Sequence, residues 1–146
     1  MLPLILAVSL ITSRTAQLDF PTTLETLIAV EGIKEHGGWK DGQHGELGPY
    51  QIKQFTWEKW SKEPFTMARI DCMETQRVVK CEIQEIMERL EARNLRPTPE
   101  LVYLCWNAGT DKVLRRETSH AQRERAQRFG RLYRFTVSAS PSGSAP

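Results

Sequence analysis

The stretch "LIAVEGIKEHGGWKDGQHGELGPYQIK", residues 27–53, decides the fold. An apolar run ends at Glu31, a glycine-rich segment follows over residues 37–48, and the chain then becomes apolar again. Glycine permits tight turns and a close approach of the backbone to a ligand. The pattern therefore predicts a helix, then an irregular loop that holds at most a small β-hairpin, then further helices.

The predicted first helix carries Glu31 on its apolar face. Thr22 and Glu25 have the spacing of a capping box, which places the helix start near them. Glu31 lies seven residues after Leu24 and four after Leu27, so it continues their stripe. Loss of hydration and the carbonyl dipoles at a helix C-terminus both favour a neutral carboxyl group. A protonated carboxyl group is what a general acid requires.

A second carboxylate, Asp41, stands ten residues after Glu31 in "KDGQHG". Two carboxylates from different segments are the usual apparatus of glycoside hydrolysis. The structural alternatives are an exposed Glu31 paired with Lys34, and an ordinary Asp-Gly turn at Asp41. Trp39 and Tyr50 flank the loop, and their rings suit either the apolar face of a sugar or the packing of a small lobe.

The rest of the chain is expected to be helical, so the predicted fold class is mainly α. A short helix in "QFTWEKWS" should turn Phe55, Trp57 and Trp60 partly inward. Thr98 is the expected cap of the helix that contains "ELVYLCWNAG". The other expected helices span residues 66–93 and 119–135. Together they give one helical domain over residues 20–135, with a small irregular or β-hairpin loop lobe.

The composition describes one ordinary globular domain with a basic end. The chain has 146 residues, 40% of them hydrophobic and 26% charged, and a net charge of +2. Residues 110–146 hold eight basic and three acidic residues, so this part suits an anionic partner such as a cell-wall polymer, a membrane surface or nucleic acid. The arginines of residues 115–134 point around the helix rather than along one stripe. A solvated helix is therefore expected, and nucleic-acid binding is not.

The two ends of the chain are interpreted separately from the domain. The apolar run at residues 2–11 suits an export signal over residues 1–16 and is too short to span a bilayer. A secreted or periplasmic protein without stable membrane insertion is expected, and a buried N-terminal segment is the alternative. Residues 136–146 end in "SASPSGSAP" and are predicted to form a disordered tail.

The cysteines and histidines indicate neither a disulfide framework nor a metal site. Cys72, Cys81 and Cys105 are expected to be free, although a bridge between Cys81 and Cys105 across two helices stays open. No group of cysteines and histidines has the spacing of a zinc site. No metal and no cofactor are expected.

Three segments occur in an order that resembles a known superfamily. They are "AVEG" at residues 29–32, "GELGPYQIKQFTW" at 45–57 and "LVYLCWNAG" at 101–109. The lysozyme-like superfamily of lytic transglycosylases, goose-type lysozymes and invertebrate-type lysozymes has a similar pattern. In that pattern a catalytic glutamate ends a helix, and a G-x-x-Q-I segment and an A-x-N-A-G-like segment follow.

The resemblance implies catalytic roles for two residues. Glu31 matches the general acid, and Asp41 matches the second carboxylate of invertebrate-type lysozymes. Gly32 stands where the family usually has a serine that helps to orient the acid. The candidate substrate-binding residues are Tyr50, Gln51, Trp106 and Asn107.

The resemblance also implies a reaction. Glu31 would protonate the bridging oxygen of the β-1,4 bond between N-acetylmuramic acid (MurNAc) and N-acetylglucosamine (GlcNAc) in peptidoglycan. Hydrolysis then needs a water or Asp41 itself, whereas a transglycosylase lets the sugar's own 6-hydroxyl close an anhydro ring. A non-catalytic glycan-binding module is the alternative function, and it would have Glu31 exposed or locked in a salt bridge.

Overall fold

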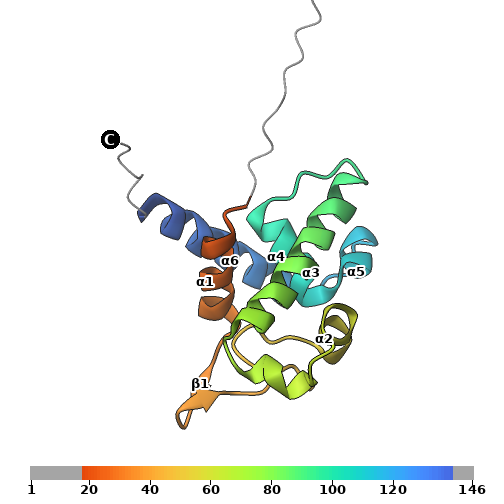
Figure 1. Ribbon diagram of the computed structural model, residues 1–146. Helices are drawn as coiled ribbons and strands as arrows, with labels where there is room; N and C mark the ends of the chain where they lie inside the picture. The colour runs from red at the N-terminus through yellow and green to blue at the C-terminus, as the bar shows by residue number, and fades with distance from the viewer. Residues whose placement is uncertain (1–17, 140–146) are drawn as a thin grey trace, which may run out of the picture.

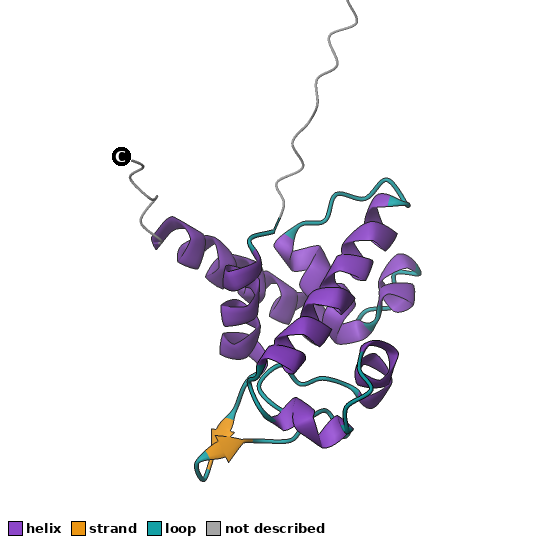
Figure 2. Cartoon of the chain, viewed as in Figure 1, coloured by secondary structure: helices purple, strands orange, loops and turns teal. Residues whose placement is uncertain are grey.

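The structure is a computed structural model that describes residues 18–139, and this part of the chain is mainly helical (Figures 1 and 2). One small antiparallel sheet pairs β1 (Lys34–Glu35) with β2 (Gly38–Trp39). The mainly helical class with a small hairpin in the loop is therefore confirmed. The helices are α1 (Phe20–Glu31), α2 (Gln54–Trp60), the 3₁₀ helix η1 (Phe65–Arg69), α3 (Met73–Glu91), α4 (Pro99–Ala108), α5 (Thr110–Leu114) and α6 (His120–Ala139).

The last helix closes the helical part of the molecule onto the first. Helix α6 packs against both α1 and α4, although α1 and α6 lie at opposite ends of the described chain. In Figure 1 the β1–β2 hairpin, the loop after it, α2 and η1 form a separate group below the other helices. The chain therefore has a helical part and a smaller loop lobe, and the end of α1 points to the junction between them.

Stacked aromatic rings join α4 to α6 in the core. The Tyr103 and Phe129 rings stack with their centroids 4.8 Å apart, and Phe129 is 6.4 Å from Tyr133. The Tyr133 hydroxyl accepts a hydrogen bond from the backbone N–H of Asp19 at 2.7 Å. The same stack thus fastens the start of α1 to α6. The largest fully buried side chains are Leu27, Tyr50, Ile52, Trp57, Tyr103 and Phe129.

Helix α1 begins earlier than the capping-box pattern predicted. Asp19 is the N-cap, and its carboxylate accepts a hydrogen bond from the backbone N–H of Thr22 at 3.0 Å. Pro21 then lies in the first turn, where its missing N–H costs nothing. Thr22 is consequently a buried residue inside the helix, and the prediction that it caps the helix with Glu25 was wrong.

The single helix predicted over residues 66–93 is broken into η1 and α3. The break lies where the loop lobe packs against Ala68 and Asp71. The Tyr50 hydroxyl donates to Asp71 at 2.9 Å. A Cβ on Gly48, which has a φ of +74°, would lie 1.8 Å from the carbonyl oxygen of Ala68. Only a glycine lets the loop approach η1 this closely.

Two further differences concern α2 and α6. Phe55 was expected to turn partly inward, but its side chain is 66% exposed, whereas Trp57 of the same helix is fully buried. Helix α6 continues to Ala139, so residues 136–139 of the expected tail are helical.

Residues 140–146 and the expected export signal lie outside the described residues. Within residues 18–139, no helix combines the length and the apolar character needed to cross a membrane.

Other local predictions are confirmed. Thr98 caps α4 and accepts from the backbone N–H of Leu101, and Gly109 ends that helix with a φ of +91°. Cys72, Cys81 and Cys105 are all free.

Candidate active site

A cleft of about 390 Å³ lies at the end of α1, between the glycine-rich loop, the C-terminal end of α4 and α6. Five of the six predicted site residues line it, and the sixth, Tyr50, does not. The five are Glu31, Asp41, Gln51, Trp106 and Asn107. Lys53 and Arg125, which were not predicted as site residues, also line the cleft, and so does Glu46.

Glu31 is the last residue of α1, and its side chain is held by α4. The Tyr103 hydroxyl donates a hydrogen bond to Oε1 of Glu31, and Nδ2 of Asn107 donates to the same oxygen at 3.4 Å. Oε2 accepts no hydrogen bond from residues 18–139, and Glu31 forms no ion pair with them. Lys34, the partner in the structural alternative, instead lies over the Trp39 ring at 5.1 Å. Half-buried Glu31 therefore has one oxygen fixed and one available to a ligand.

Tyr103 is suited to the role of permanent donor. Burial and the nearby charge of Glu31 raise the pKa of the Tyr103 hydroxyl, so it stays protonated at neutral pH. Arg125 of α6 also interacts with this hydroxyl, and its positive charge acts to lower the pKa of Tyr103. Tyr103 and Asn107 are four residues apart on α4 and thus share a face. That spacing is the sequence signal by which Tyr103 could have been found.

Asp41 lines the cleft, but Arg69 of η1 holds its carboxylate. Nη2 of Arg69 donates to Oδ2 at 2.8 Å, and Nε donates to Oδ1 at 3.2 Å. These hydrogen bonds lower the pKa of Asp41 below its usual range. A carboxylate with a lowered pKa stays ionised and is a weaker base.

Glu46 is a third carboxylate in the cleft. Its Oε2 accepts a hydrogen bond from the backbone N–H of His44 at 3.0 Å. Gly42 leaves room for it, since a Cβ there would lie 2.3 Å from Oε2 of Glu46 and 2.5 Å from Oε1 of Gln51. Glu46 thus joins Asp41 as a candidate for the second carboxylate.

Two side chains fix the loop against the helices. Gln51 has a φ of +50°, and its Nε2 donates to the carbonyl oxygens of Lys40 at 2.9 Å and Gly48 at 2.8 Å. Nζ of Lys53 donates to the carbonyl oxygen of Asn107 at 3.1 Å, which joins the loop to the end of α4. Gln51 therefore shapes the cleft from within the loop. Its side-chain oxygen, Oε1, lies next to Gly42.

The aromatic residues at the two ends of the loop pack inward. Tyr50 is 1% exposed and bonded to Asp71, so its ring supports the lobe rather than contacting a ligand in the cleft. Trp39 is half-buried and packs on Gly32. A Cβ at Gly32 would lie 2.8 Å from the Trp39 ring and 2.6 Å from the carbonyl oxygen of Ile28. A side chain at position 32 would therefore clash with both groups unless they moved.

The arginines of α6 have different local roles. Arg134 pairs with Glu100, and Arg123 donates to the backbone carbonyl of Thr118. Arg125 lines the cleft.

Comparison of the chain with protein-family models, with curated proteins and with solved structures finds no match. The residues of the cleft are therefore the basis on which a function is assigned.

Proposed function

We propose that this chain is a peptidoglycan glycosidase of lysozyme-like fold, with Glu31 as its general acid. It would cleave the β-1,4 bond between MurNAc and GlcNAc, as a muramidase or a lytic transglycosylase. The substrate lies outside the cytoplasm, so the proposal includes a secreted or periplasmic location.

The arrangement of Glu31 is the observation that supports this proposal most strongly. Two donors hold Oε1, so the carboxyl group has a fixed orientation. Oε2 is left to carry the proton that a glycosidic oxygen receives, at the wall of a cleft of about 390 Å³. A binding module would have Glu31 exposed or locked in a salt bridge, whereas Glu31 is half-buried and forms no salt bridge among the described residues.

The other residues of the cleft suit a sugar chain. Amide and carboxylate groups that match sugar hydroxyls come from Gln51, Asn107, Asp41 and Glu46. Trp106 adds an aromatic surface for the apolar face of a ring.

The second step of the reaction depends on the loop carboxylates. Asp41 or Glu46 could activate a water or stabilise the positive charge that develops on the sugar. If neither acts, Glu31 can serve a second time as base while the 6-hydroxyl of the sugar closes an anhydro ring. The two routes give different product ends.

Digestion of purified peptidoglycan, followed by mass spectrometry of the products, tests the proposal. The wild-type chain should release muropeptides with either reducing or 1,6-anhydro ends. Glu31→Gln should abolish release with an unchanged circular dichroism spectrum, because it removes the acidic proton and keeps the shape. Glu35→Gln, on the exposed hairpin, is the matched control. Wild-type activity in folded Glu31→Gln would rule out the proposed role, and binding without any cleavage by the wild type would favour the glycan-binding module.

A further inference from the structure

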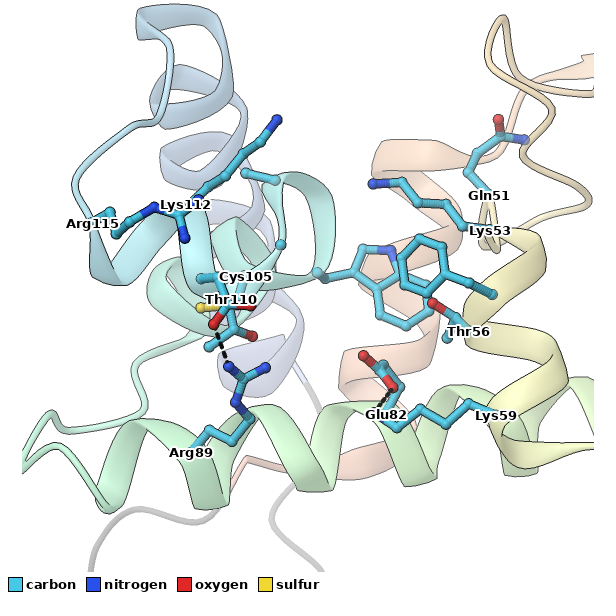
Figure 3. A pocket seen from close by; sticks show the side chains of 15 residues that line it. Gln51, Lys53, Thr56, Lys59, Glu82, Arg89, Cys105, Thr110, Lys112 and Arg115 are labelled. Carbon is cyan, nitrogen blue, oxygen red and sulfur yellow. Dashed lines mark hydrogen bonds and ion pairs between the residues drawn. The ribbon is translucent and has the colours of Figure 1, made fainter.

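A second hollow, of about 380 Å³, adjoins the cleft and has no role in the proposed reaction. The two share the lining residues Gln51, Lys53 and Trp106, so a ligand in one can continue into the other. Helices α2 and α5 stand on its two sides and α3 runs beneath it (Figure 3). Its volume lies within the range of small-ligand sites.

The hollow carries more positive than negative charge. Its five cationic lining residues are Lys53, Lys59, Arg89, Lys112 and Arg115. Three of these are neutralised by carboxylates, in the pairs Lys59–Glu82 at 3.1 Å, Arg89–Asp111 at 2.6 Å and Arg115–Glu117 at 3.0 Å.

Two ammonium groups of the hollow form no ion pair with the described residues. They are Lys53, whose Nζ donates to the backbone carbonyl of Asn107, and Lys112. Figure 3 shows Lys53 and Lys112 on opposite sides of the hollow. A carboxylate placed between them would meet a positive charge from either side.

The remaining lining residues suit a peptide that has both carboxylates and apolar groups. Glu82 and Asp111 also line the hollow, but they are already paired with Lys59 and Arg89, so the charge left for a ligand is that of Lys53 and Lys112. Phe55 is 66% exposed at the same hollow and offers an apolar surface to aliphatic side chains.

We propose that this hollow binds the carboxylates of the stem peptide that is attached to the glycan strand, with Lys112 and Lys53 as the contacting cations. The inference rests on the proposed function, because it takes peptidoglycan as the polymer in the cleft. A sugar bound beside Glu31 would lead its peptide substituent past Trp106 into the adjoining hollow. The site would favour strands that still bear peptides over bare glycan.

A binding experiment tests this without catalysis. The full chain, labelled with ¹⁵N, is titrated with GlcNAc–MurNAc-tetrapeptide and with the peptide-free disaccharide. The peptide-bearing ligand should shift the amide signals of Phe55, Thr110 and Lys112 in addition to those of the cleft. Identical shifts with the two ligands would overturn the proposal, whatever the chain cleaves.

A kinetic experiment uses charge reversal. Cleavage rates are compared on peptidoglycan with intact stems and on glycan strands freed of peptides by an amidase. Lys112→Glu should lower the ratio of the two rates about threefold, the scale of an exposed charge pair. Lys62→Glu is the control, since Lys62 is exposed and lines neither hollow. An unchanged ratio in Lys112→Glu overturns the peptide site. Failure of the wild type to cleave either polymer overturns the glycosidase function instead, and the titration then decides the peptide site alone.

Discussion

The Tyr103 hydroxyl donates a hydrogen bond to Glu31, although the two residues are 72 positions apart in the chain. Tyr103 also stacks on Phe129 of α6. One side chain thus belongs both to the core and to the candidate active site. The position of the proposed acid is therefore fixed by the packing of α4 against α6.

Tyr103→Phe should separate these two functions of Tyr103. The ring stays in the stack, while Glu31 loses one of its two donors. A hydrogen bond to a charged group contributes about 1.5–3 kcal/mol, so kcat/KM on peptidoglycan should fall at least about tenfold. Tyr133→Phe is the control, because it removes a hydroxyl of the same stack that contacts Asp19 instead. Equal losses of activity in the two variants would show that Tyr103 acts only through stability.

Asp41→Asn should cost less than about tenfold in activity. Arg69 binds the Asp41 carboxylate and lowers its pKa, which makes it a weak base. An exposed pair of this kind contributes about 0.2–1 kcal/mol to stability, so the variant should fold normally. Glu46→Gln, assayed in parallel with analysis of product ends, tests the other loop carboxylate. A hundredfold loss confined to Asp41→Asn would assign the second catalytic role to Asp41.

Gly32→Ala should destabilise the protein. The added Cβ would overlap the Trp39 ring and the carbonyl oxygen of Ile28. Overpacking of this kind costs about 1–3 kcal/mol, so the Tm should fall by several degrees. Gly38→Ala is a matched control, since a Cβ at Gly38 meets nothing within 4 Å. A Tm for Gly32→Ala equal to that of Gly38→Ala would contradict the close packing at Gly32.

Glu74 should make folding stability depend on pH in acid. Hydrogen bonds from Arg77 and Ser61 lower the pKa of Glu74 from 4.5 to about 2. A lowered pKa means that the folded state favours the ionised form, so this contribution is complete above pH 4.5 and is lost as the pH falls towards 2. Urea unfolding should therefore show wild type more stable than Glu74→Gln at pH 7, with the gap closing as the pH is lowered. A difference in the free energy of unfolding that stays constant from pH 7 to about pH 2.5 would contradict the lowered pKa of Glu74.

Local signals were enough to predict several element boundaries. Thr98 and Gly109 mark the two ends of α4 by their capping and turn preferences alone. Glu31 was placed at a helix end and partly inward from spacing, and the structure has it there. Such features depend on residues within one or two turns of the chain.

Features that depend on distant contacts were missed. Tyr50 is buried in the core, where its hydroxyl donates a hydrogen bond to Asp71, 21 residues away. Arg125 looked like one more exposed charge of a basic helix, yet α6 docks so that this residue reaches the cleft. The break between η1 and α3 lies beside the place where Gly48 approaches Ala68, a contact between segments 20 residues apart.

The docking of α6 has a consequence for protein synthesis. A ribosome makes the chain from its N-terminus, so α6 is the last of the described helices to emerge. Until it does, Tyr103 lacks the Phe129 ring beneath it, and Asp19 lacks the hydroxyl that anchors the start of α1. A nascent chain that stops before residue 120 would therefore lack the α6 contacts that support Tyr103 and the start of α1, the two elements that place Glu31 in the candidate site.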